Sequence, residues 1–384
     1  MKVLFVTRNF PPVVCGVGDY TNRLIDKFVE DGHRVSVLTT RAAVTVNHPN
    51  VIPSHINKWN LFTIPAILNA CAFVKPDYIS FQYVPYSFDK RGMPLWVVFL
   101  YLCLRIKKYN VITTFHEVGI RYTKNNIKKT ITSISQFFIA YCIAKLSYKN
   151  ITSMDLYMGY LKKYSNEVYK IPIGANILPL PVNEDYLHGL KKTVAPNNEF
   201  IFSTFGTRIS DTLLHALAAL KEENHKAKLL LLGNIPSKTR DHFRALANKL
   251  NISQDIYITG YLAEAELFAW LKVSSLFVQS EFVSATGEGG ICTKSGSLAA
   301  AFAAGLPILG TKGDTTDAIF KDNENIFLIN NDSDISIKNK IIEIMYDKEK
   351  LNIISTNAIL TYSNFFSWEK IYQQYAEVFF SYKL

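Results

Sequence analysis

A glycine-rich turn follows the first apolar run of the chain. In RNFPPVVCGVGDYT, residues 8–21, Gly16, Val17 and Gly18 stand at the start of a helix-like segment that Asp19 could cap. Free backbone N–H groups at a helix N-terminus favour an anion such as a diphosphate. The third glycine of a dinucleotide fingerprint is missing. The residues are compatible with a phosphate contact or with an ordinary tight turn, which is the simpler interpretation.

Two further candidates stand where strand-like runs end. His116, followed by Glu117, ends the run in TTFHEV, and Gly206 and Arg208 stand in FGTR, residues 205–208. Parallel sheets bind ligands at the carboxyl ends of their strands. His116 could therefore face a substrate hydroxyl or a sugar, and Arg208 could stabilise a diphosphate leaving group. The alternatives are a structural histidine and a surface arginine.

A long polar and glycine-rich segment, SEFVSATGEGGICTKSGSLAAAFAAGLPILG, covers residues 280–310. Its glycines predict a mobile turn, and TKSGS precedes an alanine-rich helix. Hydroxyl and N–H groups at that helix start, with one lysine, would form a phosphate cradle. The segment lacks the GK[ST] ending of a P-loop, which argues against a kinase or NTPase. The candidate residues are Gly287, Glu288, Gly289, Gly290, Thr293, Lys294, Ser295 and Ser297.

Alternating strand-like and helix-like segments must position these residues, and such alternation predicts parallel βαβ units. Prolines and polar residues interrupt the pattern after residue 168, and it restarts at residue 200. We predict an α/β protein with two doubly wound domains facing a cleft, covering 1–180 and 199–366, with a linker at 181–198 and a final helix at 367–384. The expected strands are 2–7, 34–40, 77–83, 110–118, 150–154, 200–206, 227–234, 255–261, 275–281 and 307–313.

Composition limits the classes of protein to which the chain can belong. The 384 residues are 48% apolar and 19% charged, which is incompatible with disorder. Five scattered cysteines indicate free thiols in a reducing compartment, and residues 2–7 leave no room for a signal peptide. The apolar run at 94–104 would rise only about 16 Å as a helix, too short to cross a bilayer.

The net charge of +10 lies in the first half, where residues 1–180 hold 22 Lys and Arg against 9 Asp and Glu. Residues 105–149 hold nine of these bases and one acid, Glu117. An anionic membrane surface is one explanation, and a solvated basic surface is the other. No nucleic-acid-binding motif accompanies the charge, so nucleic acid is not an expected partner.

The order and spacing of these segments resemble glycosyltransferase family 4, whose members have the two-Rossmann GT-B fold. The resemblance runs from PPVVCGVGDYTNRL through FHE, IPIGANI, LLLLGN and IYITGYLAEAELFAWLKVSSLFVQSEF to AAAFAAGLPILGTKGD and FFSWEKIYQQYAEVF. It implies that the second domain binds a nucleotide sugar and the first an acceptor. It also implies that residues 16–18 and Arg208 contact the diphosphate, His116 the sugar, and Tyr261 and Leu262 the base.

The sequence departs from the family pattern at three positions. Leu213 stands where the family has a lysine, and Cys292 and Ala300 stand where it has two glutamates eight residues apart. None of the three can replace a charged group. We expect Glu288 and Lys294 to take over these roles.

The resemblance implies a retaining hexosyltransferase that needs neither a metal nor a cofactor. The donor would be a UDP-, GDP- or similar sugar, and the acceptor a glycan or lipid-linked hydroxyl in bacterial surface polysaccharide assembly. The expected location is the cytoplasm, with peripheral binding to the inner face of the membrane. The alternatives are a non-catalytic binding or partner subunit, a sugar-nucleotide epimerase and a phosphorylase.

Overall fold

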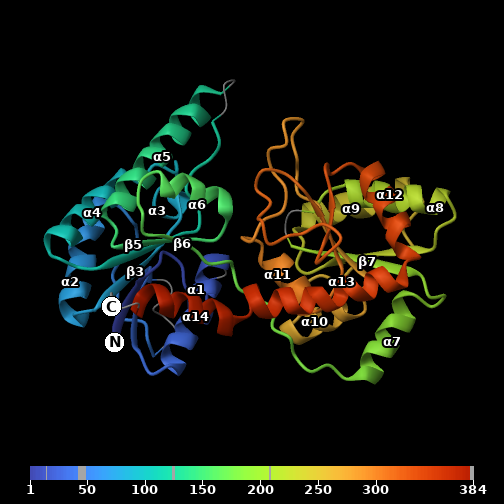
Figure 1. Cartoon of the computed structure of the whole chain (residues 1–384), viewed down its shortest axis with the longest axis horizontal. Coiled ribbons are helices and arrows are strands. Elements are labelled where there is room, and N and C mark those ends of the chain that lie inside the picture. Colours follow the sequence, from blue (N-terminus) through green and yellow to red (C-terminus); the bar gives the residue numbers. More distant parts are fainter. Residues whose placement is uncertain (14, 42–48, 123–125, 207–208, 381–384) are drawn as a thin grey trace. The chain divides into compact units, whose positions relative to one another are not determined.

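The protein divides into two compact units in a computed structural model that describes residues 1–13, 15–41, 49–122, 126–206 and 209–380 (Figure 1). Unit 1 comprises Met1–Pro172 and the segment that starts at Trp368, and unit 2 comprises Ile173–Ser367. Each unit contains one six-stranded sheet with helices on it. The prediction of two successive doubly wound α/β domains is therefore confirmed.

The sheet of unit 1 is parallel, with the strand order β2-β1-β3-β4-β5-β6. Both faces are covered, and the central strands are buried; every residue of β4, for example, is buried, its two threonines included. The chain order reverses beside β1, which places a topological switch point between β1 and β3. The strands are β1 (Lys2–Val6), β2 (Arg34–Leu38), β3 (Tyr78–Tyr83), β4 (Val111–Phe115), β5 (Lys149–Thr152) and β6 (Val168–Lys170).

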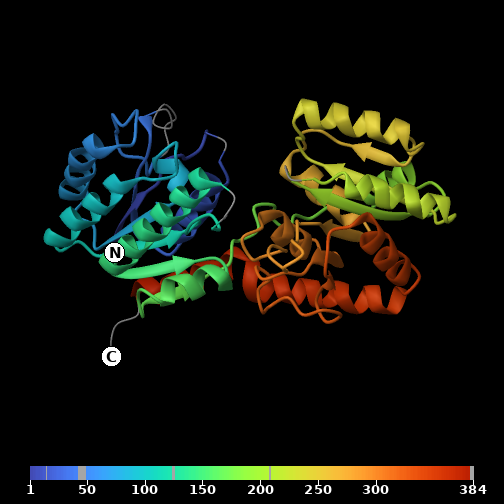
Figure 2. The ribbon, with the colours of Figure 1, turned by 90° about the horizontal axis from the view of Figure 1, so that it is seen from above.

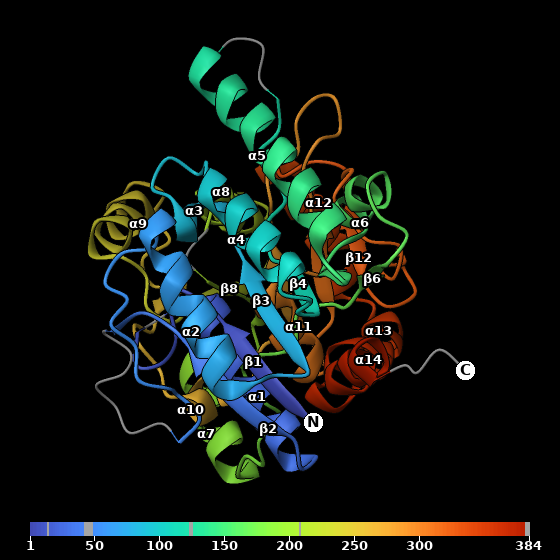
Figure 3. The same ribbon diagram turned by 90° about the vertical axis from the view of Figure 1, so that its left-hand side faces the viewer.

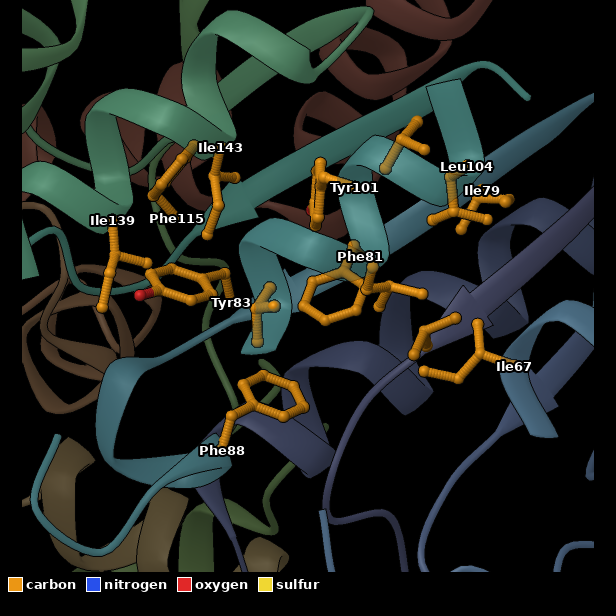
Figure 4. Close-up of a cluster of buried hydrophobic side chains, with 14 of the residues drawn as sticks. Ile67, Ile79, Phe81, Tyr83, Phe88, Tyr101, Leu104, Phe115, Ile139 and Ile143 are labelled. Carbon is orange, nitrogen blue, oxygen red and sulfur yellow. The ribbon is translucent and has the colours of Figure 1, made fainter. Parts of the chain in front are cut away.

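One face of this sheet packs against α2, α4 and α5, whose apolar side chains join those of β3 and β4 in a single core (Figures 3 and 4). Phe81 lies at its centre and packs against Phe88 and Tyr101, with ring centroids 5.1 and 5.5 Å apart. The helices are α1 (Gly16–Glu30), α2 (Ile64–Val74), α3 (Pro85–Phe88), α4 (Leu95–Ile106), α5 (Ile127–Leu146), α6 (Asp155–Lys162) and α14 (Trp368–Phe380), with the 3-10 turn η2 (Leu61–Thr63).

The sheet of unit 2 is also parallel, with the order β12-β11-β10-β7-β8-β9. Alternate residues of β8 belong to different cores: Leu230 and Leu232 to one, and Leu229 and Leu231 to the other. The sheet is thus buried on both faces. Its strands are β7 (Phe200–Phe205), β8 (Ala227–Leu232), β9 (Ile256–Ile258), β10 (Leu276–Gln279), β11 (Ile308–Thr311) and β12 (Phe327–Ile329).

The helices of unit 2 alternate with these strands along the chain. They are α7 (Glu184–Val194), α8 (Thr212–Glu222), α9 (Ser237–Lys249), α10 (Glu264–Lys272), α11 (Gly296–Ala303), α12 (Asp334–Met345) and α13 (Lys348–Thr361), followed by the π-helical turn η3 (Tyr362–Phe366).

The boundary between the units differs from the expected one. Ile173 already belongs to unit 2, where its N–H donates to Thr293 O at 3.0 Å. The expected linker, 181–198, contains helix α7, which Asn183 caps by accepting from the N–H of Tyr186. Leu187, Leu190 and Val194 of the same stretch pack into the core of unit 2. The predicted linker is therefore part of unit 2.

Helix α14 belongs to unit 1 although it comes last in the chain (Figures 1 and 2). It packs on α1, where Tyr20 donates to the Tyr375 hydroxyl at 3.1 Å and Lys27 pairs with Glu369 at 3.0 Å. The buried Lys149 ammonium donates to the carbonyl of Val378 at 2.6 Å, near the helix C-terminus, where a cation is favourable. Hydrogen bonds at both ends thus fix α14 to this unit.

We expect the stability that Tyr375 contributes to be lost in alkali. Burial raises the pKa of its hydroxyl from 10.0 to about 12. Because the folded-state pKa is the higher one, the contribution is complete below pH 10.0 and is lost as the pH rises to about 12. Between these limits the wild type should lose about 2 to 3 kcal/mol more unfolding free energy in urea than Tyr375→Phe does.

The matched control is Tyr186→Phe, which removes a half-exposed hydroxyl in unit 2. Its pH profile should follow that of the wild type. Parallel profiles for the wild type and Tyr375→Phe would show that the buried hydroxyl does not couple folding to pH.

Candidate functional site

The switch point of unit 2 lies between β7 and β10, because the chain order turns away from this pair on both sides. Ligands of such sheets bind outside the carboxyl ends of the strands at this point. Gly206 directly follows β7, with φ +135° and open space where a Cβ would stand. Continuing the register from Phe277↔Ser203 places Gly206 beside Ser280, just after β10. A ligand could therefore approach the backbone here.

A chain of polar side chains extends from the end of β10 to the start of α11. Gln279 donates to Glu281 Oε1 at 2.9 Å and accepts from the hydroxyl of Ser297 at 2.9 Å. Ser297 in turn lies 3.0 Å from the Ser295 hydroxyl, which accepts from the N–H of Leu298 and so caps α11. The predicted hydroxyl-rich helix start is present, and Ser295 is its N-cap. Gln279 and Glu281 were not predicted as site residues.

Thr293 has a different role from the predicted one. It is fully buried, and both its N–H and its hydroxyl donate to the same carboxylate oxygen of Asp317, each at 2.7 Å. Asp317 is itself 1% exposed. The pair anchors the segment that carries Lys294, so Thr293 positions the loop and its donors do not face a ligand.

Of the two positions at which the resemblance implies glutamates, Cys292 is partly exposed and Ala300 is buried. Burial raises the pKa of the Cys292 thiol to about 11, so this thiol is neutral at physiological pH. Ala300 is fully buried in α11, and Leu213 is 1% exposed in α8. The side chains of Ala300 and Leu213 therefore pack in the cores of unit 2.

The glycines of the 280–296 loop allow backbone segments to pack closely. A Cβ on Gly289 would lie 2.0 Å from Phe282 O, and one on Gly290 would lie 2.5 Å from Gly313 N. Asp314 accepts from the N–H of Gly289 at 2.9 Å. Gly289 and Gly290 are thus needed for a loop held by hydrogen bonds, whereas the sequence suggested a mobile turn. Gly287 has open space around it and lies in the turn that joins Ser284 to the exposed Glu288.

The residues expected to contact the base lie on the other half of the same sheet edge. Tyr261 follows the edge strand β9 and is 81% exposed, while Leu262 is half-buried against the core. Three strand spacings, about 14 Å, separate β9 from β10. The exposed ring is free to contact a ligand that extends across the carboxyl edge.

In unit 1 the glycine turn begins α1 directly at Gly16. Cys15, at the N-cap position, makes no side-chain capping bond, and Asp19 lies inside the helix. The expectation that Asp19 caps α1 is wrong, since the helix starts three residues earlier. A Cβ on Gly18 would lie 3.0 Å from Asn9 O, whereas Gly16 is open. Gly18 thus has a packing role, and the first turn, Gly16 and Val17 included, offers main-chain N–H groups to solvent or a ligand.

His116 follows β4 as predicted, but it is 4% exposed and hydrogen-bonded. Its Nε2 lies 2.8 Å from Gln82 Oε1, and Gln82 donates its own amide to Ser80 at 2.9 Å. With the amide placed this way, His116 Nε2 carries the proton and donates it. The imidazole edge also packs against Tyr20, at 5.5 Å between centroids. Gln82 was not predicted as a site residue, because it lies 34 residues before His116 in the sequence.

The structure thus assigns the predicted site residues to two groups. Unit 2 carries the larger group, around β7, β10 and α11, and unit 1 carries residues 16–18 and His116. Arg208 lies outside the described residues. Within the described part of the chain, no three His, Cys, Asp or Glu side chains are placed to hold a metal ion. A search of the same residues for a helix with the length and hydropathy of a membrane span finds none.

Residues 206–361, which include β8 to β12 and the α11 loop, match the family described as glycosyl transferases group 1. Unit 2 is therefore similar to this family over most of its length. No curated protein matches the sequence.

Solved structures resemble the whole chain. The Anabaena protein HepE in complex with UDP is 16% identical, with both chains fully covered and a TM-score of 0.74. Sucrose-phosphate synthase from Thermosynechococcus elongatus is 14% identical, with 98% of each chain covered and a TM-score of 0.71. WaaG, a glycosyltransferase involved in lipopolysaccharide biosynthesis, is 14% identical over 99% of this chain and 100% of its own, with a TM-score of 0.65. Likenesses at this identity show the fold, which is GT-B.

We expect the Asp317–Thr293 pair to stabilise unit 2. Asp317→Ala leaves two buried donors of Thr293 without their acceptor, which should cost about 2 to 4 kcal/mol of unfolding free energy in urea. Amide exchange of residues 290–296 should become faster as well. Asp241→Ala, on the exposed face of α9, is the control and should stay within about 0.5 kcal/mol of the wild type. Equal losses in both variants would contradict the anchoring role.

Proposed function

We propose that the protein is a retaining glycosyltransferase that moves a hexosyl group from a nucleotide sugar to an acceptor hydroxyl without a metal. The observation that carries this proposal is the donor-type surface at the switch point of unit 2. There, Gly206, the Ser295 cap and Lys294 meet the carboxyl edge of the sheet. Main-chain N–H groups and a cation suit a diphosphate.

The transfer needs a stabilised leaving group. The bond between the anomeric carbon and the diphosphate oxygen breaks, and the acceptor oxygen bonds to that carbon on the same face. Arg208, Lys294 and the N–H groups of residues 16–18 neutralise the charge that develops on the diphosphate. The acceptor proton passes to the departing phosphate oxygen, so the reaction needs no separate carboxylate base. In this mechanism His116 contacts the sugar.

The donor is a uridine diphosphate sugar in this proposal. HepE has been crystallised with UDP and with UDP-glucose, and the chain shares its fold over its full length. Tyr261 contacts the base from β9, and the diphosphate lies toward β7 and β10, so that the nucleotide extends along the sheet edge. Glu281, with its carboxylate held by Gln279, and Glu288 provide carboxylates for sugar or ribose hydroxyls.

The acceptor is a glycan or a lipid-linked glycan in the assembly of a bacterial surface polysaccharide or glycolipid. The involvement of WaaG in lipopolysaccharide biosynthesis supports this proposal. The protein would then work in the cytoplasm, at the inner face of the membrane, where the bases of residues 105–149 attract anionic lipid. The second candidate is a non-catalytic subunit, which the uncharged side chains at positions 213, 292 and 300 favour.

A nucleotide screen tests the donor site. A ligand that binds only the folded protein raises its melting temperature by mass action. We expect UDP to raise it, and GDP and ADP to raise it less. No shift with any nucleoside diphosphate would contradict the enzyme and favour the non-catalytic subunit.

Substitution of the cations tests the mechanism. Arg208→Ala and Lys294→Ala should each lower turnover by at least about 10-fold with the folded state intact, because each removes charge from the leaving group. Lys238→Ala, an exposed lysine on α9, should retain wild-type turnover. Full activity of Lys294→Ala would show that this lysine does not replace the missing one. An isomerised sugar formed from the donor without an acceptor would indicate an epimerase instead.

A further inference from the structure

Two neighbouring helices of unit 1 expose apolar side chains on the face opposite their buried one. On α5 these are Ile127, Ile131, Ile134, Phe138 and Tyr141, each between 41% and 77% exposed. Their spacing of four and three residues confines them to an arc of about 80° on a helix. Ser133, Gln136, Ala140 and Ile143 form the buried side of the same helix.

Helix α4 repeats this pattern. Leu95, Phe99, Leu102 and Ile106 follow the same spacing and are between 42% and 79% exposed, while Trp96, Val97, Leu100 and Leu104 are buried. The two helices pack side by side on one face of the sheet (Figure 3), and the Arg105 guanidinium reaches the carbonyl of Lys145 at 3.5 Å. Since both buried faces point at the sheet, the two stripes form one outer surface, named here the α4–α5 face.

Such a surface is unusual for a helix in contact with water alone. A helix with apolar residues all round is normally buried in protein or in lipid. A contiguous exposed apolar patch of this kind marks an interaction site. The stripe on α5 extends over about 21 Å, from residue 127 to residue 141.

Charge identifies the partner. Exposed bases border the stripes at both ends: Lys128 and Lys129 at the start of α5, and Lys107, Lys108 and Lys145 at the helix C-termini. Glu117 is the one acid among residues 105–149. A second copy of the chain would bring the same basic surface against itself. An anionic lipid surface supplies both the negative charge and the apolar phase.

We propose that unit 1 inserts the α4–α5 face into the interface of an anionic membrane. The two helices lie along the bilayer with their apolar stripes about 5 to 10 Å deep, and the lysines contact lipid phosphates. They cannot cross the bilayer, because their opposite sides are packed on the sheet. The inference adds detail to the proposed membrane location. The lysines attract the protein to anionic lipid, and the apolar stripes hold it in the membrane interface. It does not depend on the proposed donor or reaction.

Vesicle flotation of the full-length protein tests the inference. Ile131→Ser/Ile134→Ser/Phe138→Ser removes apolar surface without touching the core. The wild type should bind phosphatidylcholine vesicles that contain phosphatidylglycerol, and this variant should bind them at least about tenfold more weakly. Ile335→Ser/Ile353→Ser, which changes two exposed isoleucines of unit 2, is the matched control and should bind like the wild type.

The charge is tested separately. Lys128→Gln/Lys129→Gln/Lys145→Gln should weaken binding to the anionic vesicles, and added salt should then have less effect than on the wild type. Urea unfolding should be unchanged in all variants, since the substituted side chains are exposed. In an otherwise wild-type chain, Ile134→Trp should add a fluorescence signal that brominated acyl chains quench, which reports insertion directly.

Three results would overturn the inference. These are no flotation of the wild type with anionic vesicles, equal flotation of the wild type and the triple serine variant, or a dimer in light scattering that the triple serine variant disrupts. The assay uses no donor, so a failure here is distinct from a failure of nucleotide binding, which would defeat the proposed function instead.

Discussion

Parallel strands impose the main constraint on this molecule, because all carboxyl ends of a parallel sheet lie at one edge. In unit 2 this brings Gly206, Gln279 and the loop before α11 to one place although they are separated by many residues of chain. In unit 1 it brings the glycine turn after β1 and His116 after β4 to the corresponding edge. Helices packed on both faces of each sheet hold its strands, and therefore this edge, in place.

The loop before α11 lies beside the carboxyl edge of the unit 2 sheet. A buried carboxylate and several glycines determine its conformation. Asp317 fixes Thr293, and the close backbone contacts at Gly289, Gly290 and Gly313 leave no room for a Cβ. These contacts are internal, so their role is to hold the neighbouring groups, Lys294 and the Ser295 cap, in place. The polar chain from Gln279 to Ser297 adds a second connection between the strand and the helix.

The sequence predicts much of the fold, since strands such as β1 and β8 are largely apolar. Each expected strand is present, but β6 and β12 were not predicted. Helix α7 was missed because nearby prolines outweighed its spaced apolar residues. Within the site, the positions of His116 and Ser295 followed from strand ends and helix starts. The partners of His116 and Thr293 could not be predicted, because Gln82 and Asp317 are brought in by tertiary packing from 34 and 24 residues away.

The place of α14 has a consequence for synthesis on the ribosome. Tyr20, Phe28 and Thr114 lie in the first third of the chain, yet they are covered by Tyr375 and Phe379, which are translated near its end. Unit 1 therefore remains incomplete while all of unit 2 is being made, and its uncovered aromatic face must stay soluble during that time. A nascent chain that stops within the last helix would carry a finished second unit and an unfinished first one.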